Sequence, residues 1–403
     1  MKKTIISAII SGAVCSVLGA SSMTIWADDQ PATVTPAAPA GPTAMSTPSM
    51  TFPLAANPNP LSLDAGPLGT VYITGALTGL GLTQNNAGPP ICNSCDKSSI
   101  VDMSNGQIFI QKTTGLVQFF LEGGGYSFPT IGQPYVRSGD ATNDTFGIFP
   151  VGYLKLAPGN GSFSIEAGKL PSLFGAESSF TFENTNIERG LLWNQENAVT
   201  RGLQANYTSG PLAFSLSWND GYYTHKYNWA TGSAAWTINS TNTVSFVAGS
   251  NFGTTSVKDD SSVALAQDNG SMYNLIYTHT SGAWTIEPYL QYQNTPSNES
   301  IGIASSAHAW GGALLVNYAV NSKFSIPARL EYLDTSGGTN LLYGAGSKAW
   351  SVTMTPTYQE GIFFARLELS YIAADSSTAG FVFGETGTNT SQARAMIETG
   401  VIF

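Results

Sequence analysis

Residues 283–292 read AWTIEPYLQY, and residues 323–332 read KFSIPARLEY. In both stretches apolar and polar residues alternate, and a period of two is typical of a β-strand with two different faces. One face carries Trp284, Ile286, Leu290 and Tyr292 in the first stretch, and Phe324, Ile326, Leu330 and Tyr332 in the second. The other face carries Thr285, Glu287, Tyr289 and Gln291, and then Lys323, Ser325, Arg329 and Glu331. The pattern predicts strands with one face in lipid and one in water.

The low content of charged residues supports a membrane location. They make up 10% of the 403 residues, against roughly 25% in ordinary globular proteins. Helical membrane proteins contain uninterrupted apolar stretches of about 20 residues, and none follows the N-terminal segment. A mean hydropathy of +0.01 fits a barrel, because only alternate residues face lipid. A soluble two-sheet sandwich would also alternate, but the low charge and the aromatic residues at strand ends favour the membrane.

Short turns and longer polar segments alternate along the chain from Thr70 onward. The seven predicted turns are at 114–115, 158–160, 209–210, 239–241, 281–282, 320–322 and 359–360. The eight predicted external loops are near 84–105, 128–145, 170–200, 220–226, 253–269, 295–305, 334–346 and 373–392. Fifteen connections join sixteen strands, although fourteen or eighteen strands remain alternatives. We predict an all-β fold, a transmembrane antiparallel up-and-down β-barrel of about 16 strands with both termini in the periplasm.

The N-terminal region divides into two predicted segments ahead of the barrel. Lys2 and Lys3 precede an apolar run and small residues, which is typical of an export signal, predicted over residues 1–27 with cleavage after Ser22 as an alternative. Residues 28–66 are rich in Pro and Ala and predict an extended, poorly ordered periplasmic tail. Residues 67–403 are then the outer-membrane barrel.

The charge balance of the chain is acidic. Removing the signal removes two of the 16 basic residues and none of the 26 acidic ones, which leaves a net charge of −12. Nucleic-acid binding is disfavoured by this balance. An acidic protein is compatible with a cation-preferring pore, but equally with an acidic exterior that serves only solubility.

Two stretches of the sequence resemble a known family. They are GKLPSLFGAESSFTFENTNIERGLLWNQENAVTRGLQANYTSGPLAFSLSWNDGYY, which begins at Gly168, and MSNGQIFIQKTTGLVQFFLEGGGYSFPTIG, which begins at Met103. Both resemble the β-barrel porins of the OmpL-like family, and the similarity extends over most of residues 67–403. The resemblance implies a channel fold in the outer membrane of a Gram-negative bacterium and implies no particular selectivity.

The segment from Leu170 to Thr200 is the third predicted external loop and a candidate pore constriction. In many porins the third loop folds inward, and rings of charged side chains set the ion preference of a pore. The candidate constriction residues are Glu177, Glu183, Glu188, Arg189, Glu196 and Arg201. The alternative is a solvated loop at the rim of the barrel.

A second set of charged residues falls on the predicted inner faces of strands. These lumen charges are Glu166, Glu287, Lys323, Arg329, Glu331, Arg366 and Glu368. An arginine on the lipid face near the midplane would cost roughly 2–4 kcal/mol, so inward placement is expected. Conduction of ions and mutual pairing in a wet wall remain open as their roles.

Cys92 and Cys95 form a C-x-x-C motif in the first predicted loop. In an oxidising compartment a disulfide that closes a small loop is the expected state. A redox site would need a thioredoxin-like strand and helix, and zinc would need two further ligands. No hydrolase, metalloprotease or phosphate-binding motif occurs, so we expect no enzyme activity, no metal and no cofactor.

The last strand ends on Phe403, with Ala395, Ile397, Thr399 and Val401 on the same face. A terminal aromatic residue after alternating apolar residues resembles the signal read by the outer-membrane assembly machinery. We expect a passive diffusion channel for small hydrophilic solutes or ions. The expected partners are outer-membrane lipid, the assembly machinery and small hydrophilic solutes, and assembly with further copies of the chain is left open. The alternative is a barrel that serves as a surface adhesin or structural anchor.

Overall fold

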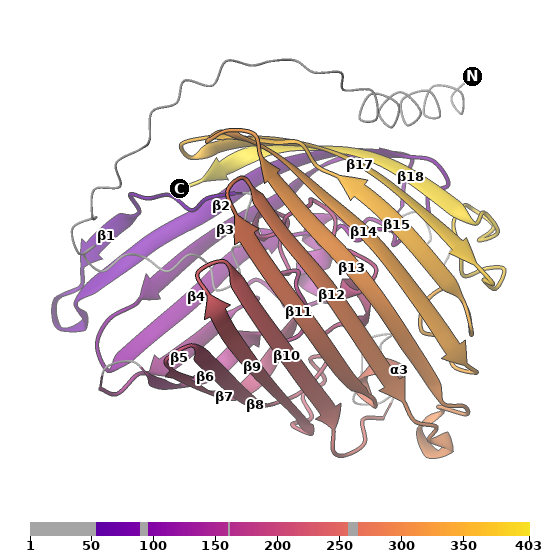
Figure 1. Cartoon of the computed structure of the whole chain (residues 1–403), viewed down its shortest axis with the longest axis horizontal. Helices are drawn as coiled ribbons and strands as arrows, with labels where there is room; N and C mark the ends of the chain where they lie inside the picture. The colour runs from indigo at the N-terminus through magenta and orange to yellow at the C-terminus, as the bar shows by residue number, and fades with distance from the viewer. Residues whose placement is uncertain (1–53, 89–95, 160–161, 257–264) are drawn as a thin grey trace. The chain divides into compact units, whose positions relative to one another are not determined.

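The computed structural model describes residues 54–88, 96–159, 162–256 and 265–403, and in them a single antiparallel sheet closes into a β-barrel (Figure 1). Sixteen strands cross the barrel wall, which confirms the predicted fold class and strand number. The sheet has 18 labelled strands, but two of the labels do not stand for a separate crossing of the wall. β15 and β16 are parts of one strand interrupted at Thr355 and Pro356, and β1 is a short strand on the edge of β2. Proline interrupts a strand because it lacks an N–H to donate.

The strands from β1 to β9 are β1 (Leu61–Asp64), β2 (Thr70–Gln84), β3 (Ser99–Lys112), β4 (Val117–Tyr126), β5 (Gly152–Leu156), β6 (Phe163–Pro171), β7 (Val199–Ser209), β8 (Leu212–Asn219) and β9 (Trp229–Asn239). The others are β10 (Asn242–Asn251), β11 (Ser271–Ser281), β12 (Trp284–Thr295), β13 (Ala307–Ala319), β14 (Phe324–Gly337), β15 (Lys348–Met354), β16 (Thr357–Glu360), β17 (Phe363–Asp375) and β18 (Ser391–Ile402).

Helices are short and lie in the connections. They are η1 (Gly66–Leu68), α2 (Ser138–Asp144), η2 (Thr181–Glu183), η3 (Trp193–Gln195), α3 (Leu265–Asp268) and η4 (Glu299–Ile301). Among the described residues, no helix has the length and apolar character needed to cross a membrane.

The barrel closes where the last strand, β18, pairs with β2. The register runs from Arg394 opposite Gln84 to Ile402 opposite Ala76. Phe403 extends this seam by one step, because its N–H donates to Gly75 O at 2.9 Å and its carbonyl accepts from Gly75 N at 2.8 Å. A side chain at Gly75 would meet the Phe403 ring, since a Cβ there would lie 2.6 Å from the ring tip. Beyond this point β1 takes over the edge of β2.

The two faces of the strands differ as the alternation predicted. In β12, Trp284, Leu290 and Tyr292 are exposed on the outer face, whereas Tyr289 and Gln291 are buried on the inner face. Aromatic pairs occur near both ends of the outer wall: Trp284 and Tyr318 are 4.6 Å apart on the turn side, and Trp310 and Tyr332 are 5.6 Å apart on the loop side. An exposed apolar belt between aromatic girdles is typical of an outer-membrane barrel.

The connections follow the predicted order, with seven short turns at one end of the barrel and eight longer loops at the other. Thr70 and Phe403, the two ends of the closed barrel, lie at the turn side. The two largest differences from the predicted boundaries are at β3 and β5. Strand β3 begins at Ser99, inside the predicted first loop, and β5 is only five residues long, so the second loop extends over residues 127–151.

The last residues of the predicted tail belong to the folded unit. Leu54 is buried at the turn side, and Ala55 exchanges hydrogen bonds of 2.8 and 2.9 Å with the side chain of Gln359. Residues 54–66 of the predicted tail are thus among the described residues and contact the barrel, and residues 28–53 lie outside them. The predicted signal, residues 1–27, lies outside the described residues. The apolar contact of Leu54 was missed because proline-rich composition around it dominated the prediction.

Deletion of Phe403 should reduce the amount of barrel in the outer membrane without changing export. The deletion removes two backbone hydrogen bonds at the seam, each worth about 1 kcal/mol, together with the terminal ring. Heat-modifiable mobility of outer-membrane fractions measures the folded amount. Phe403→Tyr keeps the ring and is the matched control. Normal barrel levels in the deletion variant would contradict the predicted role as an assembly signal.

Candidate functional site

The third loop folds into the interior of the barrel. It joins β6 to β7 over residues 172–198 and is called loop 3 below. Most residues from Ser179 to Leu192 are buried. Their partners are inward-facing side chains of β14, β17 and β18, which come much later in the sequence. This arrangement agrees with the inward fold expected of a pore constriction.

An aromatic cluster holds the tip of loop 3 against one part of the wall. Phe180 and Phe182 are fully buried, and their rings are 6.2 Å apart. Phe182 lies 5.9 Å from Phe109 of β3, and Phe109 lies 6.0 Å from Phe120 of β4. Each buried phenylalanine stabilises the loop by about 1.5–3 kcal/mol through the apolar surface that it removes from water.

An arginine of β17 binds both loop 3 and the neighbouring strand. Arg366 forms an ion pair with Glu398 of β18, and both side chains are fully buried. Its guanidinium also donates to the carbonyl oxygens of Asn184 at 3.0 Å and Thr181 at 2.8 Å. The Thr181 hydroxyl donates to Glu398 at 2.5 Å. One buried salt bridge in the wall therefore fixes the position of the loop backbone.

A second arginine, on β18, binds a carboxylate of loop 3. Arg394 Nη1 lies 2.8 Å from Glu188 Oε1, and both side chains are almost completely buried. The other carboxylate oxygen accepts from the Ser370 hydroxyl at 2.9 Å. Arg394 also donates to the Thr130 carbonyl of the second loop at 2.8 Å, so this arginine joins two loops to the wall.

A third arginine, on β14, lies between two carboxylates. Arg329 Nε is 3.0 Å from Glu331 Oε2, and its Nη1 forms an ion pair with Glu177 of loop 3. Nη1 also donates to the carbonyl of Glu188 at 2.7 Å. Removing either carboxylate would leave a buried cation with weaker compensation.

Glu368 of β17 accepts hydrogen bonds from the loop backbone. The amides of Ile187 and Glu188 donate to its two carboxylate oxygens at 2.5 and 2.9 Å, and the Thr355 hydroxyl donates at 2.6 Å. Backbone amides around an ionised carboxylate form charge-assisted hydrogen bonds, which are about twice as strong as neutral ones. Glu368 therefore holds the loop rather than standing free in the lumen.

Arg189 is inside loop 3 and does not face carboxylates across an opening. It donates to the carbonyl oxygens of Pro129 at 2.9 Å and Ser179 at 2.5 Å, and its backbone forms a parallel bridge with Thr130. Its role is to join loop 3 to the second loop. We predicted that Arg189 would face the loop carboxylates across the pore. It does not, because its guanidinium donates its hydrogen bonds to backbone carbonyl oxygens.

The remaining two carboxyl groups of loop 3 are also enclosed. The Phe180 amide donates to Glu183 at 3.3 Å. Glu196 accepts a hydrogen bond from the Tyr289 hydroxyl, and burial raises the pKa of Glu196 to about 8, which this hydrogen bond partly opposes. Burial therefore disfavours the charged form of Glu196.

Arg201 lies on the outer wall and not at the constriction. It is paired with Lys169 across β6 and β7 and shares the outward face of Leu203. Its Nε lies 2.7 Å from Asp220 Oδ2, and its guanidinium is 3.6 Å from the centre of the Tyr223 ring. Arg201 follows loop 3 directly in the sequence, as predicted, but Asp220 at the end of β8 compensates its charge on the outer wall.

The predicted lumen charges are inward, with one exception. Glu166 pairs with Lys155 at 3.2 Å, and Glu287 accepts from the Thr278 hydroxyl at 2.7 Å. Lys323 instead lies in the exposed turn before β14, where it pairs with Glu360. It was assigned to the lumen by extending the alternation of β14 one residue beyond its first hydrogen-bonded position.

Several residues of the site were not predicted from the sequence. Arg394 and Glu398 are on the inner face of β18, whereas the apolar residues that precede Phe403 in the predicted assembly signal are on its outer face. The alternation of that strand could have revealed them. The contacts of the second loop and of the loop at residues 338–347, where the Leu341 carbonyl accepts from Gln195 at 2.9 Å, have no local signal.

Cys92 and Cys95 lie outside the described residues, so the disulfide stays a prediction. Within the described part of the chain, no cluster of three or more His, Cys, Asp or Glu side chains is arranged to hold a metal ion.

Comparisons with known proteins concern the whole barrel. A family model described as "Putative beta-barrel porin-2, OmpL-like" matches residues 70–403. No curated protein matches the chain in sequence. An anion-selective porin from Comamonas acidovorans has a TM-score of 0.58 and 12% identity, over 83% of this chain and 99% of that one.

Two further solved structures are similar in fold. A trimer form of the outer membrane protein OmpT of Vibrio cholerae has a TM-score of 0.53 and 12% identity, over 83% of this chain and 99% of that one. The outer membrane channel DcaP of Acinetobacter baumannii has a TM-score of 0.55 and 10% identity, over 83% of this chain and 97% of that one. At these identities the likeness shows a shared barrel fold.

Proposed function

The chain belongs to the β-barrel porin-2, OmpL-like family of the outer membrane, and from this premise we propose that it is a passive diffusion channel for small hydrophilic solutes or ions. The observation that carries the proposal is loop 3, which is held inside the barrel by three arginines of the wall. A barrel of 16 strands is wide enough to leave an aqueous channel. A loop fixed in its interior narrows that channel and sets the size of solute that passes.

A preference for cations is the finer part of this proposal. Among the described residues, acidic side chains outnumber basic ones on the inner faces of the strands and in loop 3. The acidic ones are Asp102, Glu122, Glu166, Glu177, Glu183, Glu188, Glu287, Glu331, Glu368 and Glu398, with Glu196 left out because its charged form is disfavoured, and the basic ones are Lys155, Arg189, Arg329, Arg366 and Arg394. The fold does not determine the sign of selectivity, since one similar structure is an anion-selective porin.

The alternative function is a surface adhesin or structural anchor without transport. Short connections such as residues 220–228 and 296–306 offer little surface to a partner, which favours the channel. The descriptions of the family and of the similar structures are of porins and channels, so we propose no enzymatic activity. A trimer form among the similar structures supports the proposal that several copies assemble.

Recordings of the purified barrel in planar bilayers test the proposed function. A channel should give discrete conductance steps, and a salt gradient should give a reversal potential whose sign reports cation preference. A barrel shown to be folded by its heat-modifiable mobility but without conductance would favour the anchoring alternative. A reversal potential of the opposite sign would remove the cation preference and leave the channel proposal standing.

Glu287→Gln should move the reversal potential towards zero. Glu287 is an inward, partly buried carboxylate of β12 that accepts a hydrogen bond from the Thr278 hydroxyl. No lysine or arginine in the described residues forms an ion pair with Glu287, whereas Glu188 is matched by Arg394. Glu360→Gln, in an exposed turn, is the control and should change nothing. Equal reversal potentials for Glu287→Gln and the unchanged protein would exclude Glu287 as a selectivity residue.

A further inference from the structure

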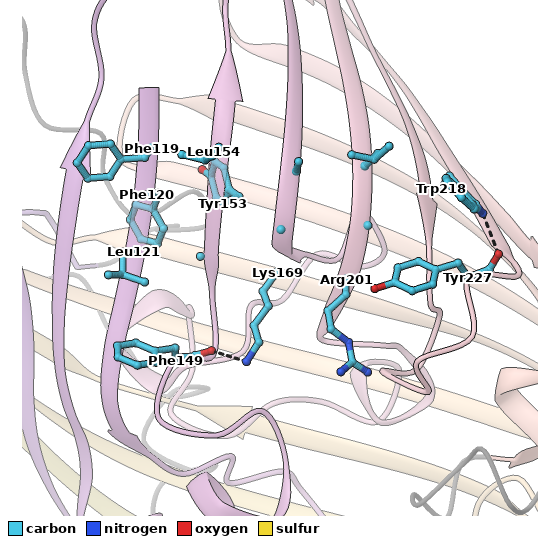
Figure 2. Close-up of a pocket in the computed structure, with 15 residues that line it drawn as sticks. Phe119, Phe120, Leu121, Phe149, Tyr153, Leu154, Lys169, Arg201, Trp218 and Tyr227 are labelled. Atoms are coloured by element: carbon cyan, nitrogen blue, oxygen red, sulfur yellow. Dashed lines mark hydrogen bonds between the residues drawn. The ribbon is translucent and has the colours of Figure 1, made fainter. Parts of the chain in front are cut away.

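A hollow of about 880 Å³ lies on the outer, lipid-facing wall across β4 to β8 (Figure 2). Its sides are formed by outward apolar residues, including Phe119, Leu121, Leu154, Leu203 and Trp218. These side chains are exposed or partly exposed, so the hollow opens towards the membrane. Its size is within the range of ligand pockets, roughly 300–1,000 Å³.

Gly152 of β5 and Ala167 of β6 form the floor of the hollow, because two small residues stand there on the outward face. Gly152, Gly168 and Gly202 belong to β5, β6 and β7, and all three line it. A Cβ at Gly168 would lie 2.2 Å from the carbonyl oxygen of Gly152, and one at Gly202 would lie 2.2 Å from that of Trp218. Gly168 and Gly202 stand opposite the inward residues Tyr153 and Asn219, so they allow the strands to approach closely. A Cβ at the outward Gly152 would lie 3.2 Å from Leu121 Cδ1, so a small residue at this position keeps the hollow open.

A lysine stands at the loop-side end of the hollow. Lys169 Nζ donates to the carbonyl oxygens of Phe146 at 2.9 Å and Phe149 at 2.8 Å, and lies 5.5 Å from the centre of the Tyr223 ring. An ammonium has three N–H donors, so one remains for a further acceptor. Lys169 has no carboxylate partner among the described residues, whereas the neighbouring Arg201 is matched by Asp220.

The apolar surface continues from this lysine towards the turn side. A second outward hollow of about 450 Å³ follows along β7 and β8, lined by residues that include Ala205, Tyr207 and Leu216. From Arg201 to Tyr207 the strand advances roughly 20 Å. Half of a bilayer core is about 15 Å thick, so even a tilted strand of this length spans the depth of one leaflet's acyl chains.

We propose that this wall holds one lipid with a phosphate headgroup, from the leaflet on the loop side of the barrel. The phosphate accepts the free N–H of Lys169, and an acyl chain lies in the hollow between Leu121, Leu154 and Leu203. The anionic headgroup of such a lipid matches the charge of Lys169. Its acyl chains match the apolar hollow, which lies deeper in the membrane than this lysine. The site is separate from loop 3 and does not depend on conduction.

A second copy of the chain fits this face less well. The outward side chains of β4 to β8 in the described residues include no carboxylate, so two copies packed through this face would bring Lys169 and its symmetry mate together without a counter-charge. A phosphate lipid removes that cost because it supplies the missing anion.

Native mass spectrometry of the detergent-solubilised barrel tests the site with three probes. Dilauroyl phosphatidic acid carries the phosphate and the acyl chains, dilauroylglycerol has the chains alone, and inorganic phosphate has the anion alone. We expect one tightly retained phosphatidic acid and no comparable retention of the other two. Lys169→Gln should weaken retention roughly tenfold, as expected for loss of one charge-assisted hydrogen bond. Ala167→Phe, which fills the hollow from its floor, should abolish it.

Matched controls are available in the chain. Lys112 also donates to two carbonyl oxygens, those of Thr114 and Val117, but at the turn side and away from the hollow, so Lys112→Gln should retain lipid normally. Ala365→Phe places the same ring on the outer face of β17. Equal retention by Lys169→Gln and Lys112→Gln, or of dilauroylglycerol and phosphatidic acid, would overturn headgroup recognition. Inorganic phosphate bound as tightly as phosphatidic acid would overturn the lipid proposal in favour of a free anion. Lipid-free oligomers that only Ala167→Phe dissociates would overturn it in favour of a second copy of the chain.

Discussion

Replacing residues 178–189 with a short Gly-Ser linker should raise the single-channel conductance severalfold. This segment contains the aromatic tip and the backbone groups that Arg366 and Glu368 bind. Its removal exposes an inner wall of charged and polar side chains to water. The linker is sterically feasible, because the amide of Gly190 lies 2.8 Å from the carboxylate of Glu177 and the two ends of the deletion are therefore close.

The same replacement should widen the range of solutes that pass. Liposome swelling with sugars of increasing mass measures the limit, alongside planar-bilayer conductance. Shortening residues 296–306, a connection on the same side of the barrel, is the control and should leave conductance unchanged. Heat-modifiable mobility must show a folded barrel in both variants. Unchanged conductance in a folded loop 3 variant would show that loop 3 does not limit the pore.

Arg366→Met should destabilise the barrel by roughly 3–5 kcal/mol and raise its conductance. The substitution leaves Glu398 buried without its cation, and breaking one side of a buried pair costs about this amount. It also removes the two donors that hold the carbonyls of Thr181 and Asn184. Denaturant unfolding in lipid vesicles measures the first effect, and single-channel recording measures the second.

The double variant Arg366→Met with Glu398→Met separates the two effects. With both charges gone, no unpaired carboxylate remains, so most of the stability should return. The loop carbonyls still lack their donors, so the higher conductance should persist. Lys323→Met, in an exposed ion pair with Glu360, is the control and should change stability little. A double variant as unstable as Arg366→Met alone would show that the loop contacts, and not the ion pair, supply the stability.

The order of strands, turns and loops was predictable because alternation is a local property. Each face of β12 and β14 follows from residues two apart in the chain, and a strand in contact with lipid on one side and water on the other must show that period. The inward fold of the third loop was expected from its position and its length. The sequence did not predict that the carboxyl groups of this loop would be so deeply buried.

What the sequence by itself determined is the order of strands, turns and loops, the apolar belt and the polar interior, since these depend on neighbours along the chain. Sixteen was the preferred strand number, and the pairing of β18 with β2 that closes the barrel joins the two ends of the chain's folded part. Only the tertiary structure decided which charges meet: Arg394 binds Glu188 from 206 positions away, and Arg366 reaches the backbone at Thr181 from 185. Closure of the sheet brings such residues into one lumen, and no local pattern encodes that pairing. For Arg201 and Lys169 the partners lie in neighbouring connections, Asp220 for the first and the carbonyls of Phe146 and Phe149 for the second, and their placement decides which cation stays uncompensated on the lipid-facing wall.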